Sequence, residues 1–196
     1  IKALAEKYEP YIVERRRYYH SCPELSNEEK ETSAQIRHDL EAMGIAVQEV
    51  PGCYGLVADI RGGAQGATVA LRADMDALPI NESDAPDHLP QRRGFRSENP
   101  GSMHTCGHDG HSAIGLAVAT LIAANRAALC GTIRLIFQPA EEGVRGGKSL
   151  VAAGVVDDAD YFIALHLGLG VPQRSFVAGA GGFLASSKLD VTYRGV

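Results

Sequence analysis

No stretch of the 196-residue sequence is apolar over the roughly 20 residues that a membrane-spanning helix needs, and no signal-peptide pattern opens it. Dense runs of lysine and arginine are also absent apart from residues 15–17, and the formal net charge is -5. These absences argue against a membrane partner and against a nucleic-acid surface. We therefore expect a soluble, cytoplasmic protein whose one basic cluster lies on the solvated face of the first helix.

Cysteine is scarce, and its spacing excludes two common uses. The four cysteines form neither a C-x-x-C pair nor the pattern of a compact disulfide framework. Reduced thiols are therefore the default, and Cys22, Cys53 and Cys130 are expected to be small core or surface residues. Cys106 differs because it lies in a segment that is dense in metal-binding side chains.

The apolar periodicity predicts an α/β fold with one sizeable core. Helices are expected over residues 1–21, with Pro10 as a kink or as the true start, and after the N-cap Ser26 as far as Gly44. A further, well-buried helix is expected over 112–129. Strands are expected at 45–50, 56–60, 68–72, 132–137 and 161–165.

Three segments are expected to be less regular or less complete. Residues 81–100 have no sustained period and predict a long loop. Residues 171–182 resemble a further strand followed by a glycine-rich turn. Residues 188–193 alternate as a half-exposed strand does, but no partner strand follows, which suggests that the chain is a piece of something larger.

The densest cluster of reactive side chains is S-M-H-T-C-G-H-D-G-H at residues 102–111. Cys106 and His108 stand two residues apart, and Gly107 allows the tight bend that would direct both side chains to one centre. One hypothesis is a metal held by a thiolate and an imidazole. A second hypothesis is a polar loop whose histidines cap the next helix, and the C-x-H pair alone does not exclude it.

Acids and a histidine follow three of the predicted strands. Asp74 and Asp76 end the strand at 68–72, Glu141 and Glu142 follow 132–137, and His166 ends 161–165. In a parallel sheet these strand ends share one edge, where ligands gather. Adjacent carboxylates can serve as metal ligand and general base, although acids that cap loops or helices would explain each pair separately.

Four segments in order resemble the dinuclear metallopeptidase family of aminoacylases, hippurate hydrolases and indole-acetyl-amino-acid hydrolases. They are R-A-D-M-D-A-L-P at 72–79, M-H-T-C-G-H-D-G-H at 103–111, L-I-F-Q-P-A-E-E-G at 135–143 and A-L-H at 164–166. The segment V-V-D-D-A-D-Y-F at 155–162 is most similar to the branch of the aminobenzoyl-glutamate hydrolase A subunits. The resemblance covers nearly the whole chain, but only the first part of a family member.

The resemblance implies a site and a fold. Cys106, His108, Glu142 and His166 would bind two divalent metal ions, Mn²⁺ or Zn²⁺, and Glu141 would be the general base. Asp76 would orient a ligand, while the roles of Asp74, His104 and His111 stay open. The implied fold is a three-layer α/β sandwich whose mostly parallel central sheet is flanked by helices. Residues 1–184 would form part of this catalytic domain, and 185–196 the first strand of an α+β lid or dimerisation domain.

The implied activity is hydrolysis of the amide between an acyl or aryl-acyl group and an amino acid, for example in p-aminobenzoyl-glutamate. The small-molecule substrate would be an N-acyl-amino acid, and the full-length protein would form a homodimer or a hetero-oligomer with a related subunit. Deacetylation of N-acetyl-amino acids or N-acetyl-diaminopimelate, or hydrolysis of hippurate, uses the same chemistry. A metal-binding module without activity, and an enzyme with Cys106 as its nucleophile, stay open as well.

Overall fold

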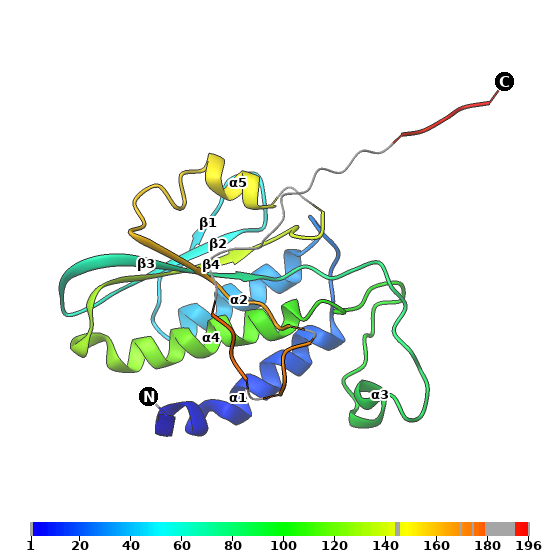
Figure 1. Cartoon of the computed structure of the whole chain (residues 1–196), viewed down its shortest axis with the longest axis horizontal. Helices are drawn as coiled ribbons and strands as arrows, with labels where there is room; N and C mark the ends of the chain where they lie inside the picture. Colours follow the sequence, from blue (N-terminus) through cyan, green and yellow to red (C-terminus); the bar gives the residue numbers. More distant parts are fainter. Residues whose placement is uncertain (1, 144–145, 169, 174, 179–190, 196) are drawn as a thin grey trace.

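The computed structural model describes residues 2–143, 146–168, 170–173, 175–178 and 191–195, and it contains one five-stranded sheet with helices on both faces (Figure 1). The helices are α1 (Lys2–Ser21), α2 (Lys30–Ala42), α3 (Leu89–Arg93), α4 (His108–Asn125) and α5 (Gly146–Ala152). The strands are β1 (Gln48–Glu49), β2 (Leu56–Arg61), β3 (Ala64–Asp74), β4 (Cys130–Gln138) and β5 (Tyr161–Ala164). None of these helices is long and apolar enough to cross a membrane.

The strands lie in the order β1-β2-β4-β3-β5, and β2 alone runs against the other four. β3 pairs in parallel with β4 on one side and with β5 on the other. The carboxyl ends of these three strands therefore meet at one edge of the sheet. The sequence-based prediction of an α/β fold with a mostly parallel central sheet is confirmed.

Alternating side chains give the sheet two apolar faces. Leu56, Leu135 and Phe137 belong to the main core, on the side that α1, α2 and α4 cover (Figure 1). Val57 and Ile136, one residue along their strands, point to the opposite face and pack with Leu150 of α5. A period of two along each strand thus supplies both layers and fixes the register of the sheet.

Two helix starts differ from the prediction. α2 begins at Lys30, and Ser26 does not cap it; the carboxylate of Glu24 instead accepts hydrogen bonds from the backbone N–H groups of Glu31 and Thr32. α4 begins at His108, four residues earlier than expected, after Gly107 in a left-handed conformation. His108 consequently lies in the first turn of the helix instead of in a loop before it.

Other differences concern packing and short elements. α1 continues through Pro10, only Gln48–Glu49 of the strand expected at 45–50 is formed, and α3 interrupts the loop expected at 81–100. β5 is exposed at the sheet edge, although its residues are mostly apolar. The strand expected from residue 171 is wrong, because the described residues 171–173 and 175–178 contain none.

The predicted start of a second domain is mostly beyond what the structure describes. Residues 191–193 form no strand, while 188–190, like most of the proposed lid segment 185–196, lie outside the described residues. The boundary at residue 184 falls there too and stays a prediction. The regular elements among the described residues are thus the sheet and the helices around it.

Candidate metal centre

The structure brings together side chains from four segments at the edge where β3, β4 and β5 end. Cys106, His108 and Glu142 each offer a ligand atom, and these atoms lie within 4.8 Å of one another. Nε2 of His166 lies 3.5 Å from Sγ of Cys106. The loop before α4, the first residue of α4 and the loops after β4 and β5 thus supply sulfur, nitrogen and oxygen donors to one small volume.

Hydrogen bonds orient both imidazoles in the same way. Nδ1 of His108 lies 2.8 Å from the backbone oxygen of Asp76, and Nδ1 of His166 lies 2.8 Å from that of Leu167. A carbonyl oxygen only accepts, so each Nδ1 carries the proton and each Nε2 presents a lone pair. Nε2 of His108 is buried without a hydrogen-bond partner among the described residues, as a metal-ligating nitrogen would be.

Negative charge gathers around the thiol of Cys106. Burial raises the pKa of this thiol to about 12, with a hydrogen bond to Glu142 and the charges of Glu142, Glu141 and Asp74 adding to the effect. A thiol in such surroundings ionises readily only when a cation compensates the charge. One sulfur, two imidazole nitrogens and a carboxylate are donors that fit a divalent transition metal.

Asp76 connects the segments that carry these donors. Its Oδ1 lies 3.2 Å from Nδ1 of His108, and its Oδ2 accepts from the Ser26 hydroxyl at 2.6 Å and from the Glu142 backbone N–H at 3.0 Å. Burial favours the neutral acid, but the hydrogen bonds from His108 and Ser26 outweigh it and lower the pKa of Asp76. The carboxylate is therefore ionised and holds the loop after β4 against α4.

His111 braces the site through both ring nitrogens. Its Nε2 accepts the Leu167 backbone N–H at 2.8 Å, so Nδ1 carries the proton and donates to Asp74. Asp74 also pairs with Arg72 at 2.6 Å. Asp74, His108, His111 and His166 offer ligand atoms within 4.8 Å of one another, but His111 has no lone pair left for a metal.

Glu141 lies beside the donor cluster on a loop with an unusual backbone. Its Oε2 is 4.0 Å from Nε2 of His108, and its side chain is 40% exposed. The preceding Ala140 has a φ of 50°, and its N–H donates to the buried carboxylate of Glu29 at 2.7 Å. Glu29 thus positions this loop directly, and Ser26 supports it through Asp76. The sequence did not indicate the contact with Glu29, because 111 residues separate Glu29 from Ala140.

A second, buried ionic network supports α4 from the side of α1. His20 is 2% exposed and donates from Nδ1 to Asp109 at 2.8 Å and from Nε2 to Glu82 at 2.9 Å. Arg16 also pairs with Asp109 at 2.8 Å, and His88 with Glu82 at 2.8 Å. Arg16 forms its ion pair while 39% of its side chain stays exposed, and His88 is 26% exposed. His20 makes both bonds only as an imidazolium, because carboxylates accept.

His104 is buried near this network. Both of its ring nitrogens are without a hydrogen-bond partner among the described residues, and burial lowers its pKa to about 4. The imidazole is therefore neutral at pH 7. Among the described residues, His104 belongs to neither group of converging ligand atoms.

Replacing Gly107 with alanine is expected to destabilise the fold and weaken metal binding. Gly107 has a φ of 94°, and a Cβ there would lie 3.0 Å from Cδ1 of Leu167. A left-handed alanine costs about 1–2 kcal/mol, and the contact would shift Cys106 and His108. Gly101→Ala is the matched control, since its φ is 82° with open space around it. Urea unfolding and metal titration should show a stability loss in both variants but a metal-binding loss only for Gly107→Ala; equal metal binding in the two would contradict this role.

The His20 network predicts a pH-dependent stability. Burial lowers the pKa of His20, but the hydrogen bonds to Asp109 and Glu82 outweigh it, so the pKa is raised above 6.5. An imidazole whose folded-state pKa is raised contributes its full stabilisation below pH 6.5. That stabilisation is lost as the pH rises through the folded-state pKa. The stability difference between wild type and His20→Gln should thus be larger at pH 6 than at pH 9, measured by urea unfolding. His38→Gln, whose side chain is 75% exposed, should show no such trend; a difference for His20→Gln that is independent of pH would exclude the imidazolium.

The fold and the donor cluster define an α/β protein with a candidate metal centre at the carboxyl ends of parallel strands. The chain belongs to peptidase family M20/M25/M40, whose family model matches residues 70–194. The resemblance seen in the four sequence segments is thereby confirmed at the level of the family.

Relatives and solved structures add detail to this membership. The chain is 52% identical over 145 residues to indole-3-acetyl-aspartic acid hydrolase of Enterobacter agglomerans, and 50% identical over 144 residues to the A subunit of p-aminobenzoyl-glutamate hydrolase of Escherichia coli. Each match covers 74% of this chain and 33% of the relative, so the chain matches about a third of their length. The YxeP protein of Bacillus subtilis, a dinuclear metal-binding peptidase of the M20 family, superposes with a TM-score of 0.76 at 40% identity, covering 87% of this chain and 45% of that one.

Proposed function

We propose that the protein is a metal-dependent amidohydrolase that cleaves the amide between an acyl or aryl-acyl group and an amino acid. The observation that carries this is the convergence of ligand atoms of Cys106, His108 and Glu142 within 4.8 Å of one another. Nε2 of His166 lies 3.5 Å from Sγ of Cys106, and Glu141 lies beside His108. A binding module would need the donors but would have no use for the second carboxylate. Family membership supports the same conclusion.

In this proposal Cys106, His108, Glu142 and His166 hold two divalent ions. Bound metals would supply Lewis acidity, which polarises a carbonyl and lowers the pKa of water. Imidazole and thiolate suit zinc, whereas carboxylate oxygen suits manganese, so both metals fit this donor set. Metal analysis of the intact protein as isolated distinguishes the two ions.

Glu141 acts as the proton carrier of the reaction. Its carboxylate is half-exposed and close to the donor cluster, so it can reach a water molecule on the solvent side. It accepts a proton from the attacking water and delivers that proton to the leaving amine as the amide bond breaks. Asp76 holds His108 and the backbone of Glu142 in place without touching substrate.

The names of the two relatives support an aryl-acyl group joined to an acidic amino acid as the substrate class. The test measures amine release by the intact protein from p-aminobenzoyl-glutamate, indole-3-acetyl-aspartate, hippurate and N-acetyl-diaminopimelate. The two acidic aryl-acyl conjugates should give the highest kcat/KM. Faster hydrolysis of the N-acetyl compound would indicate a deacetylase instead.

The Escherichia coli relative is by its name one subunit of a hydrolase, which supports assembly of the full-length protein with a related second subunit. We further propose that residues 1–184 belong to the catalytic domain and that 185–196 begin a lid or dimerisation domain. Size-exclusion chromatography with light scattering, with and without a co-expressed related subunit, separates a homodimer from a hetero-oligomer.

A further inference from the structure

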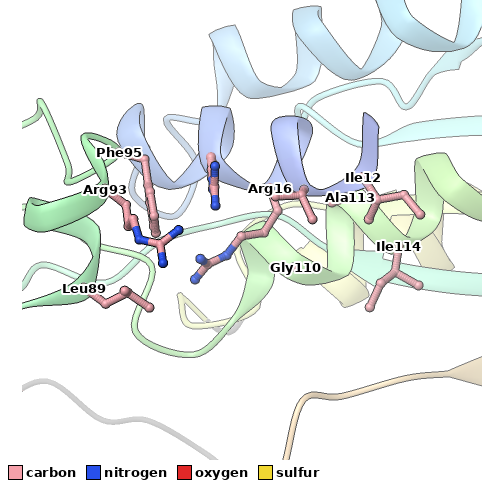
Figure 2. A pocket seen from close by; sticks show the side chains of 10 residues that line it. Ile12, Arg16, Leu89, Arg93, Phe95, Gly110, Ala113 and Ile114 are labelled. Carbon is pink, nitrogen blue, oxygen red and sulfur yellow. The ribbon is translucent and has the colours of Figure 1, made fainter. Parts of the chain in front are cut away.

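A cavity of about 400 Å³ lies between α1, α3 and α4 (Figure 2), and none of its lining residues is a donor of the candidate metal centre. From α4 it is lined by Gly110, Ala113 and Ile114. Successive helical residues are rotated by about 100°, so these three positions lie on a different face of α4 from His108. The volume is within the range of sites that bind small organic molecules.

Three arginines line this cavity, and none of its lining residues is acidic. Arg16 and Arg17 come from α1, Arg93 comes from the end of α3, and Figure 2 shows the guanidinium groups of Arg16 and Arg93 directed into the same space. Like charges brought together in a partly desolvated cavity repel one another. An anion placed between them would relieve that repulsion.

The guanidinium groups retain donors for such an anion. Arg16 uses Nε for its ion pair with Asp109 and makes no hydrogen bond from its terminal nitrogens to the residues that the structure describes. Arg16 and Arg17 each lie with their guanidinium carbon 5.3 Å from the ring centroid of Phe95, which fixes their orientation. Arg93 makes no ion pair with any described side chain. Orientated guanidinium groups match the two oxygens of a carboxylate.

The remaining walls are apolar. Ile12 and Val13 of α1, Leu89 of α3 and Ile114 of α4 surround the space, with Phe95 behind it. Val13 is 39% exposed and Leu89 is 53% exposed, so apolar surface faces the cavity next to the three cations. An inorganic anion would leave this surface in contact with water, whereas an apolar body attached to a carboxylate would cover it.

We propose that the cavity binds an organic carboxylate with an aromatic or branched apolar body, at a site separate from the metal centre. The carboxylate lies among the guanidinium groups of Arg16, Arg17 and Arg93. The apolar body lies against Leu89 and Ile114. Binding here requires no metal and can be measured without turnover, so it is tested independently of the proposed hydrolase activity.

Calorimetric titration of the intact protein with benzoate tests this site, with benzamide as the neutral isostere and inorganic phosphate as the anion without a body. Benzoate should bind more tightly than either compound. Arg93→Met and Arg17→Met should each weaken benzoate binding by about tenfold or more, because each removes a charged hydrogen bond. Arg92→Met is the matched control, because Arg92 lies on α3 outside the cavity, and its exposed charge should change the affinity by only about twofold.

Two further measurements locate the ligand. The His108→Ala protein should bind benzoate as tightly as the wild type does. Loss of benzoate binding in this variant would place benzoate at the metal centre and overturn the proposal. Intermolecular NOEs from the benzoate ring should reach the methyl groups of Leu89 and Ile114. Absence of benzoate binding, equal binding of benzamide or phosphate, or equal effects of Arg93→Met and Arg92→Met would each overturn it.

Discussion

Glu141→Gln is expected to lower kcat of the intact protein by about two to four orders of magnitude, the usual contribution of a general acid-base group. Glutamine keeps the size and polarity of the side chain but cannot carry the proton from water to the amine. Glu141 is not among the proposed ligands, so the metal content should be unchanged. Steady-state kinetics together with metal analysis of the same sample measure both quantities.

Glu98→Gln is the control for this change, because Glu98 is an exposed acid outside the donor cluster. Its kcat should equal that of wild type. If Glu141→Gln retained activity within about tenfold, the observed effect would be below what proton transfer contributes and the assignment of the base would be wrong. If it lost metal as well as activity, Glu141 would be a ligand instead.

His108→Ala is expected to remove both metal and activity. Among the described residues, His108 is the one residue that belongs to both groups of converging donors, and its buried Nε2 makes no hydrogen bond. Loss of an outer partner such as Asp76 weakens metal binding by about 10- to 100-fold, so loss of the ligand itself should exceed about 100-fold. Metal titration monitored by calorimetry provides the comparison between His108→Ala and Asp76→Ala.

His38→Ala is the matched control, since this histidine lies on α2 with an exposed side chain and outside either donor group. Circular dichroism before titration separates loss of metal from loss of fold. An affinity in His108→Ala equal to that in Asp76→Ala would mean that His108 positions the site without binding the metal.

The parts of the site that follow strand ends could be predicted from sequence. Apolar runs identified β3, β4 and β5, and the rule that parallel strands end at one edge was enough to bring Asp76, Glu142 and His166 together. Cys106 and His108 were found because two donors lie within three residues. These signals are local, so a single sequence contains them.

The supporting contacts could not be predicted in the same way. Glu29 holds the loop after β4, Ser26 bonds Asp76, and His20 bonds Asp109 across 89 residues. Nothing near these residues in the sequence distinguishes a buried acid or histidine from an exposed one on a helix. Their role depends on how α1 and α2 pack against α4, which is a property of the tertiary structure. The early start of α4 was missed because two glycines and an aspartate there are typical of a loop.

β5 lies unshielded at the edge of the sheet, which exposes the isolated polypeptide to intermolecular association. Tyr161, Phe162 and Ile163 are 63%, 55% and 46% exposed, and among the described residues the strand pairs on one side only, with β3. An apolar strand with unbonded amides is a template for intermolecular β-pairing. Refolding yield of the 196-residue polypeptide should therefore decline as its concentration rises. A lysine in place of Phe162 would act as a gatekeeper and should improve recovery.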